Sequence, residues 1–133
     1  MNNALNLIGR LLIAALFLPA GLAKLSGFEG TVGYIESVGL PLPAVAAAAA
    51  LALEILGSVA LIVGFQTCIV AAVLAVFTLV ASIFFHAFWA AAPEQAFVQQ
   101  LLFFKNIGVI GGLLVLVSTG AGAWSIDAKK AAQ

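Results

Sequence analysis

Four ionisable side chains interrupt stretches of sequence that are otherwise apolar. They are Lys24, Glu54, His86 and Lys105, one within or at the edge of each stretch. A charge in hydrocarbon costs about 2.5 kcal/mol or more, so such residues usually face a protein interior or a water-filled cavity. A carboxylate and an imidazole can relay protons there, and an ammonium group can stabilise negative charge developing on a ligand. We therefore expect the four side chains to converge between helices.

The expected site has three kinds of residue. His86 and Glu54 are candidates for a proton relay. Arg10 lies at a depth close to that of Glu54, so these two residues are candidates for a buried ion pair. The candidate ligand-binding residues, expected around a pocket towards the outer side, are Lys24, His86, Trp89, Lys105 and Asn106. Its apolar walls would come from Phe84, Phe85, Phe88, Trp89 and Phe103.

Each of these residues also has a purely structural interpretation. Arg10 and Lys24 can extend along the helix and place their charges in the headgroup layers. Glu54 with a basic partner can fix helix geometry without taking part in chemistry. His86 and Asn106 can be interior residues that only hydrogen-bond a neighbouring helix. The functional interpretation rests on the four ionisable positions taken together.

The composition indicates a membrane protein of one domain. Of its 133 residues, 65% are hydrophobic and 8% are charged, whereas a typical soluble domain has about 25% charged residues. The net charge is zero, so no basic surface for nucleic acid is expected. Cys68 is the only cysteine, which excludes an intrachain disulfide or a CxxC pair. One cysteine and one histidine do not supply the usual ligands of a zinc site, and no metal site is predicted.

Hydropathy predicts an all-α membrane protein, a bundle of four transmembrane helices formed by residues 1–133 as one domain. A membrane-spanning helix needs about 20 mainly apolar residues. The four predicted spans are 5–24, 44–64, 68–90 and 101–119. Between the first two, residues 28–38 have an apolar and an acidic face, which predicts a short interfacial helix in the first outer loop.

Polar and small residues at helical spacing predict the inward faces of the spans. Thr78, Ser82 and His86 align on the third span, with hydroxyl groups expected to bond their own helix. Lys105, Gly108 and Gly112 align on the fourth, where the GxxxG pattern favours close helix packing in lipid.

An even number of spans places both termini on one side of the membrane. The basic residues on that side are Arg10, Lys129 and Lys130, and the opposite loops carry Glu29, Glu36 and Glu94. The positive-inside rule therefore predicts cytoplasmic termini. The alternative for the first span is a signal peptide, because small residues at 20–23 resemble a cleavage site.

Several ordered motifs resemble those of the DoxX family of bacterial membrane proteins. They are the runs 21–28 (GLAKLSGF), 34–41 (YIESVGLP), 86–89 (HAFW), 104–106 (FKN) and 120–127 (GAGAWSID), together with Glu54 and Gly57. The resemblance covers nearly the whole chain. It implies a four-helix bundle in the bacterial inner membrane. One branch of this family supplies the small subunit of a thiosulfate:quinone oxidoreductase, and another is linked to a membrane complex that handles oxidative and thiol stress.

Three functions are compatible with these features, and the sequence leaves open whether the chain is itself an enzyme. The first is the membrane subunit of a quinone-linked redox complex, with no intrinsic cofactor and with electrons from an oxidoreductase partner subunit. The pocket would then hold a quinone or another lipid. The second is a noncatalytic membrane anchor or assembly platform. The third is transport of a small solute or proton by a homo-oligomer, since Glu54 lies near the predicted midplane.

Overall fold

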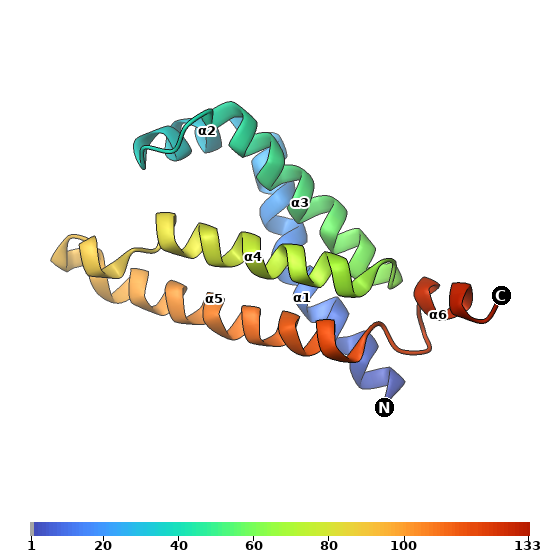
Figure 1. Cartoon of the computed structure of the whole chain (residues 1–133). Coiled ribbons are helices and arrows are strands. Elements are labelled where there is room, and N and C mark those ends of the chain that lie inside the picture. Colours follow the sequence, from blue (N-terminus) through green and yellow to red (C-terminus); the bar gives the residue numbers. More distant parts are fainter. Residues whose placement is uncertain (1) are drawn as a thin grey trace.

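The computed structural model describes residues 2–133, and this part of the chain contains helices and loops but no strand. Four segments are long and apolar enough to cross a membrane. They are α1 (Asn3–Ser26), α3 (Pro43–Val63), α4 (Thr67–Phe85) with the following 3-10 turn η1 (Phe88–Ala90), and α5 (Pro93–Thr119). Two shorter helices are α2 (Phe28–Ser37) and α6 (Ile126–Ala131). The predicted class, an all-α bundle of four membrane helices, is confirmed (Figure 1).

Two helix ends differ from the prediction. Helix α5 begins at Pro93 instead of Leu101, because proline fits the first turn of a helix, where its missing N–H is not needed. Glu94 in the same turn adds a favourable charge near the helix N-terminus. Helix α4 ends at Phe85, so His86 terminates the helix and does not lie one turn inside it. Residues 28–37 form a helix, as predicted.

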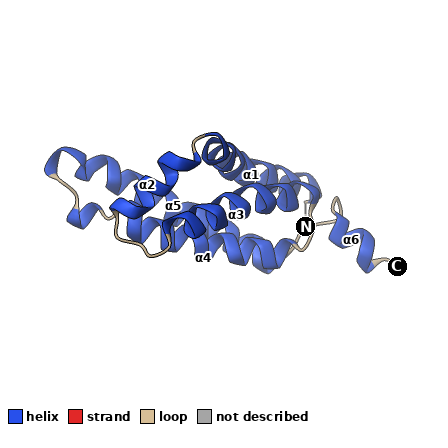
Figure 2. Ribbon diagram, turned by 90° about the horizontal axis from the view of Figure 1, so that it is seen from above, coloured by secondary structure: helices blue, strands red, loops and turns tan. Residues whose placement is uncertain are grey.

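The bundle consists of two helix pairs, α1 with α3 and α4 with α5. Helices α3 and α4 join the two pairs, whereas α1 and α5 make few contacts. The pairs lie close together at the end that holds the start of α1 and all of α6, and they diverge towards α2 (Figures 1 and 2). We name these the terminal end and the α2 end.

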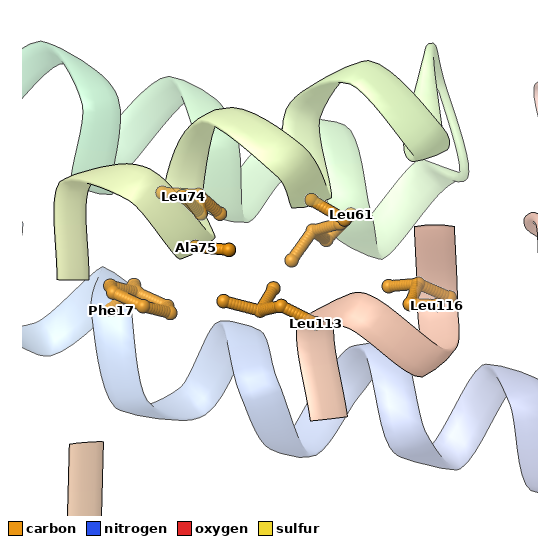
Figure 3. Packing of buried hydrophobic residues seen from close by; sticks show 7 residues of the cluster. Phe17, Leu61, Leu74, Ala75, Leu113 and Leu116 are labelled. Atoms are coloured by element: carbon orange, nitrogen blue, oxygen red, sulfur yellow. The ribbon is translucent and has the colours of Figure 1, made fainter. Parts of the chain in front are cut away.

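The apolar core occupies the half of the bundle nearer the terminal end. Leu61 of α3, Leu74 of α4 and Leu113 of α5 are fully buried and meet Phe17 of α1 (Figure 3). Gly57 permits close packing here, because a Cβ atom at this position would lie 3.1 Å from the Leu74 side chain. In lipid no hydrophobic drive holds helices together, so this close fit and polar contacts must do so.

The predicted inward face of α5 is wrong for its glycines. Asn106, Leu113 and Leu116 are its buried residues, whereas Lys105 and Gly108 are exposed. A glycine stripe promotes packing only where a second backbone approaches it. None does so here, since no heavy atom lies within 4 Å of a Cβ built on Gly108. Leucine side chains instead fill the space between the helix pairs.

Arg10 joins three segments at the terminal end. Its side chain is completely buried, and each guanidinium nitrogen donates a hydrogen bond. Nη1 donates to the carbonyl oxygens of Leu61 (2.8 Å) and Ile62 (3.1 Å) near the end of α3, and Nη2 donates to that of Trp124 (2.6 Å). Helices leave their last carbonyl groups without intrahelical partners, and Arg10 supplies donors at this end. The interpretation of Arg10 as an anchor in the headgroup layer is therefore wrong.

The segment that precedes and begins α6 completes this junction. The Asp127 carboxylate accepts hydrogen bonds from the backbone N–H groups of Gln66 (2.7 Å) and Thr67 (2.9 Å), where α4 begins. Its own N–H donates to the Gly64 carbonyl oxygen (2.9 Å). Burial opposes ionisation of Asp127, but these N–H groups, the Thr67 side chain and the charge of Lys130 together outweigh it and lower its pKa. The carboxylate thus stays charged at neutral pH and caps α4.

Replacing Arg10 should test this junction. We expect Arg10→Leu to lower the free energy of unfolding by about 2–4 kcal/mol, because carbonyl groups of α3 and of the segment before α6 lose their donor. Arg10→Lys should recover only part of this loss, since an ammonium group cannot reproduce the planar fork. Unfolding in detergent would measure both, with Lys129→Leu as a control at an exposed basic residue of the same end. Equal stability of Arg10→Leu and Lys129→Leu would contradict the conclusion that Arg10 stabilises this junction.

Alanine variants of Gly64 and Gly39 can distinguish the effect of backbone strain on stability from the effect of steric clash. Both have positive φ, 68° and 80°, so alanine is strained at either position. A Cβ atom on Gly64 would lie 2.3 Å from the Ser125 Cβ and 2.8 Å from Arg10 Nη1, whereas nothing lies within 4 Å at Gly39. We expect Gly39→Ala to lower the free energy of unfolding by roughly 1–2 kcal/mol. Gly64→Ala should lower it clearly more. Similar unfolding midpoints for the two variants would show that the close contact at Gly64 is not important.

Candidate ligand-binding site

A pocket of about 590 Å³ lies towards the α2 end, where the helix pairs diverge. Residues of all five helices from α1 to α5 line it, and most of the lining is apolar. Its polar lining includes the side chains of Lys24, Glu54, His86, Lys105 and Asn106. This volume is in the range of small-molecule sites, which combine apolar walls with a few polar groups. The four ionisable residues singled out by the sequence thus line one pocket.

Lys24 and Glu54 form an ion pair between α1 and α3. The Lys24 Nζ atom lies 3.1 Å and 2.9 Å from the two carboxylate oxygens of Glu54. The Glu54 side chain is only 7% exposed, and that of Lys24 is 27% exposed. Gly21 allows α1 to approach closely enough, since its Cβ would lie 3.2 Å from the backbone nitrogen of Ile55.

The predicted ion pair of Arg10 with Glu54 is wrong. Depth along the helices suggested it, but Arg10 donates its hydrogen bonds to Asn6 and to backbone carbonyl oxygens at the terminal end. Lys24 lies in the last turn of α1 and reaches Glu54 from the other direction.

Hydrogen bonds connect Asn106 of α5 with the polar face of α4. The Asn106 amide Nδ2 donates to Ser82 Oγ (2.9 Å), and Ser82 Oγ donates to the Thr78 carbonyl oxygen (2.6 Å). Thr78 Oγ1 donates to the Leu74 carbonyl oxygen (2.7 Å), so both hydroxyl groups bond their own helix as predicted. All three residues are buried. Asn106 and Thr78 thus form a fixed polar part of the pocket wall.

His86 is held by Gln99, a residue that the sequence analysis did not identify. The His86 Nδ1 atom lies 2.8 Å from Gln99 Oε1. An amide oxygen only accepts hydrogen bonds, so with the amide in this orientation Nδ1 carries the proton and Nε2 is left for other partners. Gln99 lies in α5, where the sequence predicted a loop, and this error concealed the contact.

The prediction that Trp89 is a ligand-binding residue is wrong. It does not line the pocket, its side chain is 59% exposed, and it packs edge-on against Phe88 and Phe103. Because α4 ends at Phe85, the chain turns away before Trp89. Of the five predicted aromatic walls only Phe85 lines the pocket; the other aromatic walls are Phe17, Tyr34 and Phe77. The Tyr34 and Phe85 rings, 5.1 Å apart, connect α2 to α4.

Comparison with known proteins agrees with this architecture. The DoxX family model matches residues 5–87. The chain belongs to the DoxX family. Two relatives from Escherichia coli (strain K12) are similar along nearly their whole length. Inner membrane protein YphA is 33% identical over 91% of this chain and 86% of the relative, and inner membrane protein YqjF is 40% identical over 91% and 88%.

A eukaryotic member of the comparison is similar over a shorter part. The Surfeit locus protein 4 homolog of Schizosaccharomyces pombe is 37% identical over 52% of this chain but only 24% of its own length. No solved structure matches the chain. The DoxX family and the four apolar helices together identify an integral membrane protein, and the two bacterial relatives are inner-membrane proteins, the location predicted for this chain.

Variants of Lys24 and of Glu54 should lower the stability of the protein by unequal amounts. We expect Lys24→Met to lower stability by about 1–3 kcal/mol, because it leaves a buried carboxylate without its cation. Glu54→Gln should cost less, since Lys24 is partly exposed and can turn to the surface. The double variant Lys24→Met/Glu54→Leu should recover part of the first loss. A double-mutant cycle of unfolding free energies measures this coupling, and purely additive effects would contradict it.

Proposed function

We propose that this DoxX protein is the quinone-binding membrane subunit of a redox complex. The observation that carries the proposal is that Lys105 lines the pocket without a hydrogen bond or ion pair to any residue within 2–133. A cation beside apolar walls at membrane depth favours a polar or anionic partner. Quinones are flat, apolar molecules with two carbonyl oxygens that accept hydrogen bonds. Their chemistry matches aromatic walls with a cation and an imidazole.

The proposed reaction needs little from the chain beyond charge and protons. Two electrons from a partner protein that carries a flavin or a metal centre, with two protons, convert a quinone to its quinol. Each carbonyl oxygen gains a proton, and no group is transferred. Lys105 would stabilise negative charge developing on one oxygen, and His86 would exchange a proton. The Lys24–Glu54 pair would add a fixed dipole in the wall, with Glu54 mainly positioning Lys24.

A noncatalytic anchor or assembly platform is the second candidate. It is supported by the internal partners of the other polar pocket residues, namely Lys24 with Glu54, Asn106 with Ser82 and His86 with Gln99. Such contacts fix helix positions without any ligand. This candidate leaves the exposed Lys105 to the headgroup layer and predicts no saturable binding.

Titration with a water-soluble short-chain quinone distinguishes the two functions. We expect the purified protein in nanodiscs to bind it saturably, and His86→Ala and Lys105→Gln each to weaken binding about tenfold, the loss of one good hydrogen bond. Trp89→Leu is the matched control, because Trp89 lies at the same end outside the pocket. Absence of saturable binding, or equal binding by all variants, would favour the platform.

A further inference from the structure

A second hollow, which we name the α3–α4 groove, lies between these two helices. Its volume is about 530 Å³, and every side chain that lines it is apolar. Along α3 it extends from Ala52 to Val63, and at the terminal end it is bounded by Phe65 and Ile126. Neither Glu54 nor any other residue of the first pocket lines it. The groove is thus a separate site without groups for catalysis.

The length of the groove matches one leaflet of a bilayer. Ala52 and Val63 are separated by roughly 17 Å of helix at about 1.5 Å rise per residue. The hydrocarbon layer is about 30 Å thick, so half of it is of the same length. The groove starts where α3 ends and runs towards the middle of the membrane. An acyl chain whose headgroup lies at the terminal end would follow it.

Helix α6, whose Ile126 bounds the terminal end of the groove, carries two lysines. Lys130 Nζ lies 4.5 Å from the centroid of the Phe65 ring, which itself lines the groove. Lys129 is its exposed neighbour. The acidic group of α6, Asp127, is engaged by the backbone N–H groups of Gln66 and Thr67 and partly offsets these charges. Helix α6, which bounds this end of the groove, thus carries two cations against one carboxylate.

We propose that the α3–α4 groove binds an anionic phospholipid of the leaflet at the terminal end. One acyl chain lies along α3 and α4, and the phosphate lies beside Lys130 and Lys129. The apolar groove provides affinity for any lipid chain, whereas the lysines select a headgroup with net negative charge. Contact with Phe65 reduces the freedom of Lys130 and places its ammonium group over the groove.

Lipid titration in a zwitterionic detergent, read by native mass spectrometry, tests the charge selection. We expect the parent protein to bind phosphatidylglycerol roughly ten- to thirtyfold more tightly than phosphatidylcholine of the same chains. Lys129→Gln/Lys130→Gln should abolish this preference, and Lys129→Arg/Lys130→Arg should keep it. Equal affinity for the two lipids in the parent, or a preference that survives the glutamine variant, would overturn the proposal.

A second pair of variants tests the position of the acyl chain. Val59 is 48% exposed and lines the groove, whereas Val45 is 63% exposed on α3 outside it. We expect Val59→Trp to weaken binding of both lipids by filling the groove, and Val45→Trp to leave binding unchanged. Glycerol phosphate, which has the anionic group without chains, should not compete. Competition by glycerol phosphate, or equal effects of the two tryptophan variants, would place the lipid elsewhere.

Discussion

The buried guanidinium group of Arg10 is the interaction on which the rest of the bundle depends. Carbonyl groups at the end of a helix are costly to bury without donors, and in a membrane no water is available in the hydrocarbon layer to supply them. Arg10 donates to α3 and to the segment before α6, so it closes the terminal end around α1. Asp127 adds the connection to α4. One arginine and one aspartate, on segments more than a hundred positions apart, thus hold three helices together.

Closure at one end explains why the other end can open. With the core residues packed near the terminal end, α1 and α3 diverge from α4 and α5 without losing contact at their base (Figures 1 and 3). The Lys24–Glu54 pair keeps α1 and α3 together in the open half, and Asn106 with Ser82 does the same for α4 and α5. An ion pair therefore connects the helices of one pair and a hydrogen bond connects those of the other. The pocket forms between the two pairs.

The sequence predicted the helices and much of the pocket for physical reasons that are easy to state. Apolar length identifies a span, and a charge within a span usually faces the protein interior, so the pocket residues Lys24, Glu54, His86 and Lys105 were found. Backbone acceptors have no sequence signal, which is why Arg10 was assigned to Glu54 and the role of Asp127 was missed. Gln99 was missed because the prediction began α5 too late.

The two ends of the bundle differ in whether a basic side chain has acceptors within the protein, and this difference bears on function. At the terminal end each guanidinium nitrogen of Arg10 has an acceptor, so the protein itself provides the partners of this buried charge. At the α2 end Lys105 has no acceptor within residues 2–133, although it lines an apolar pocket. A cation beside apolar walls without an internal acceptor favours a polar or anionic ligand, which is the basis of the quinone proposal. The asymmetry supports the proposed ligand at the α2 end, whereas the hydrogen bonds of Arg10 at the terminal end stabilise the fold.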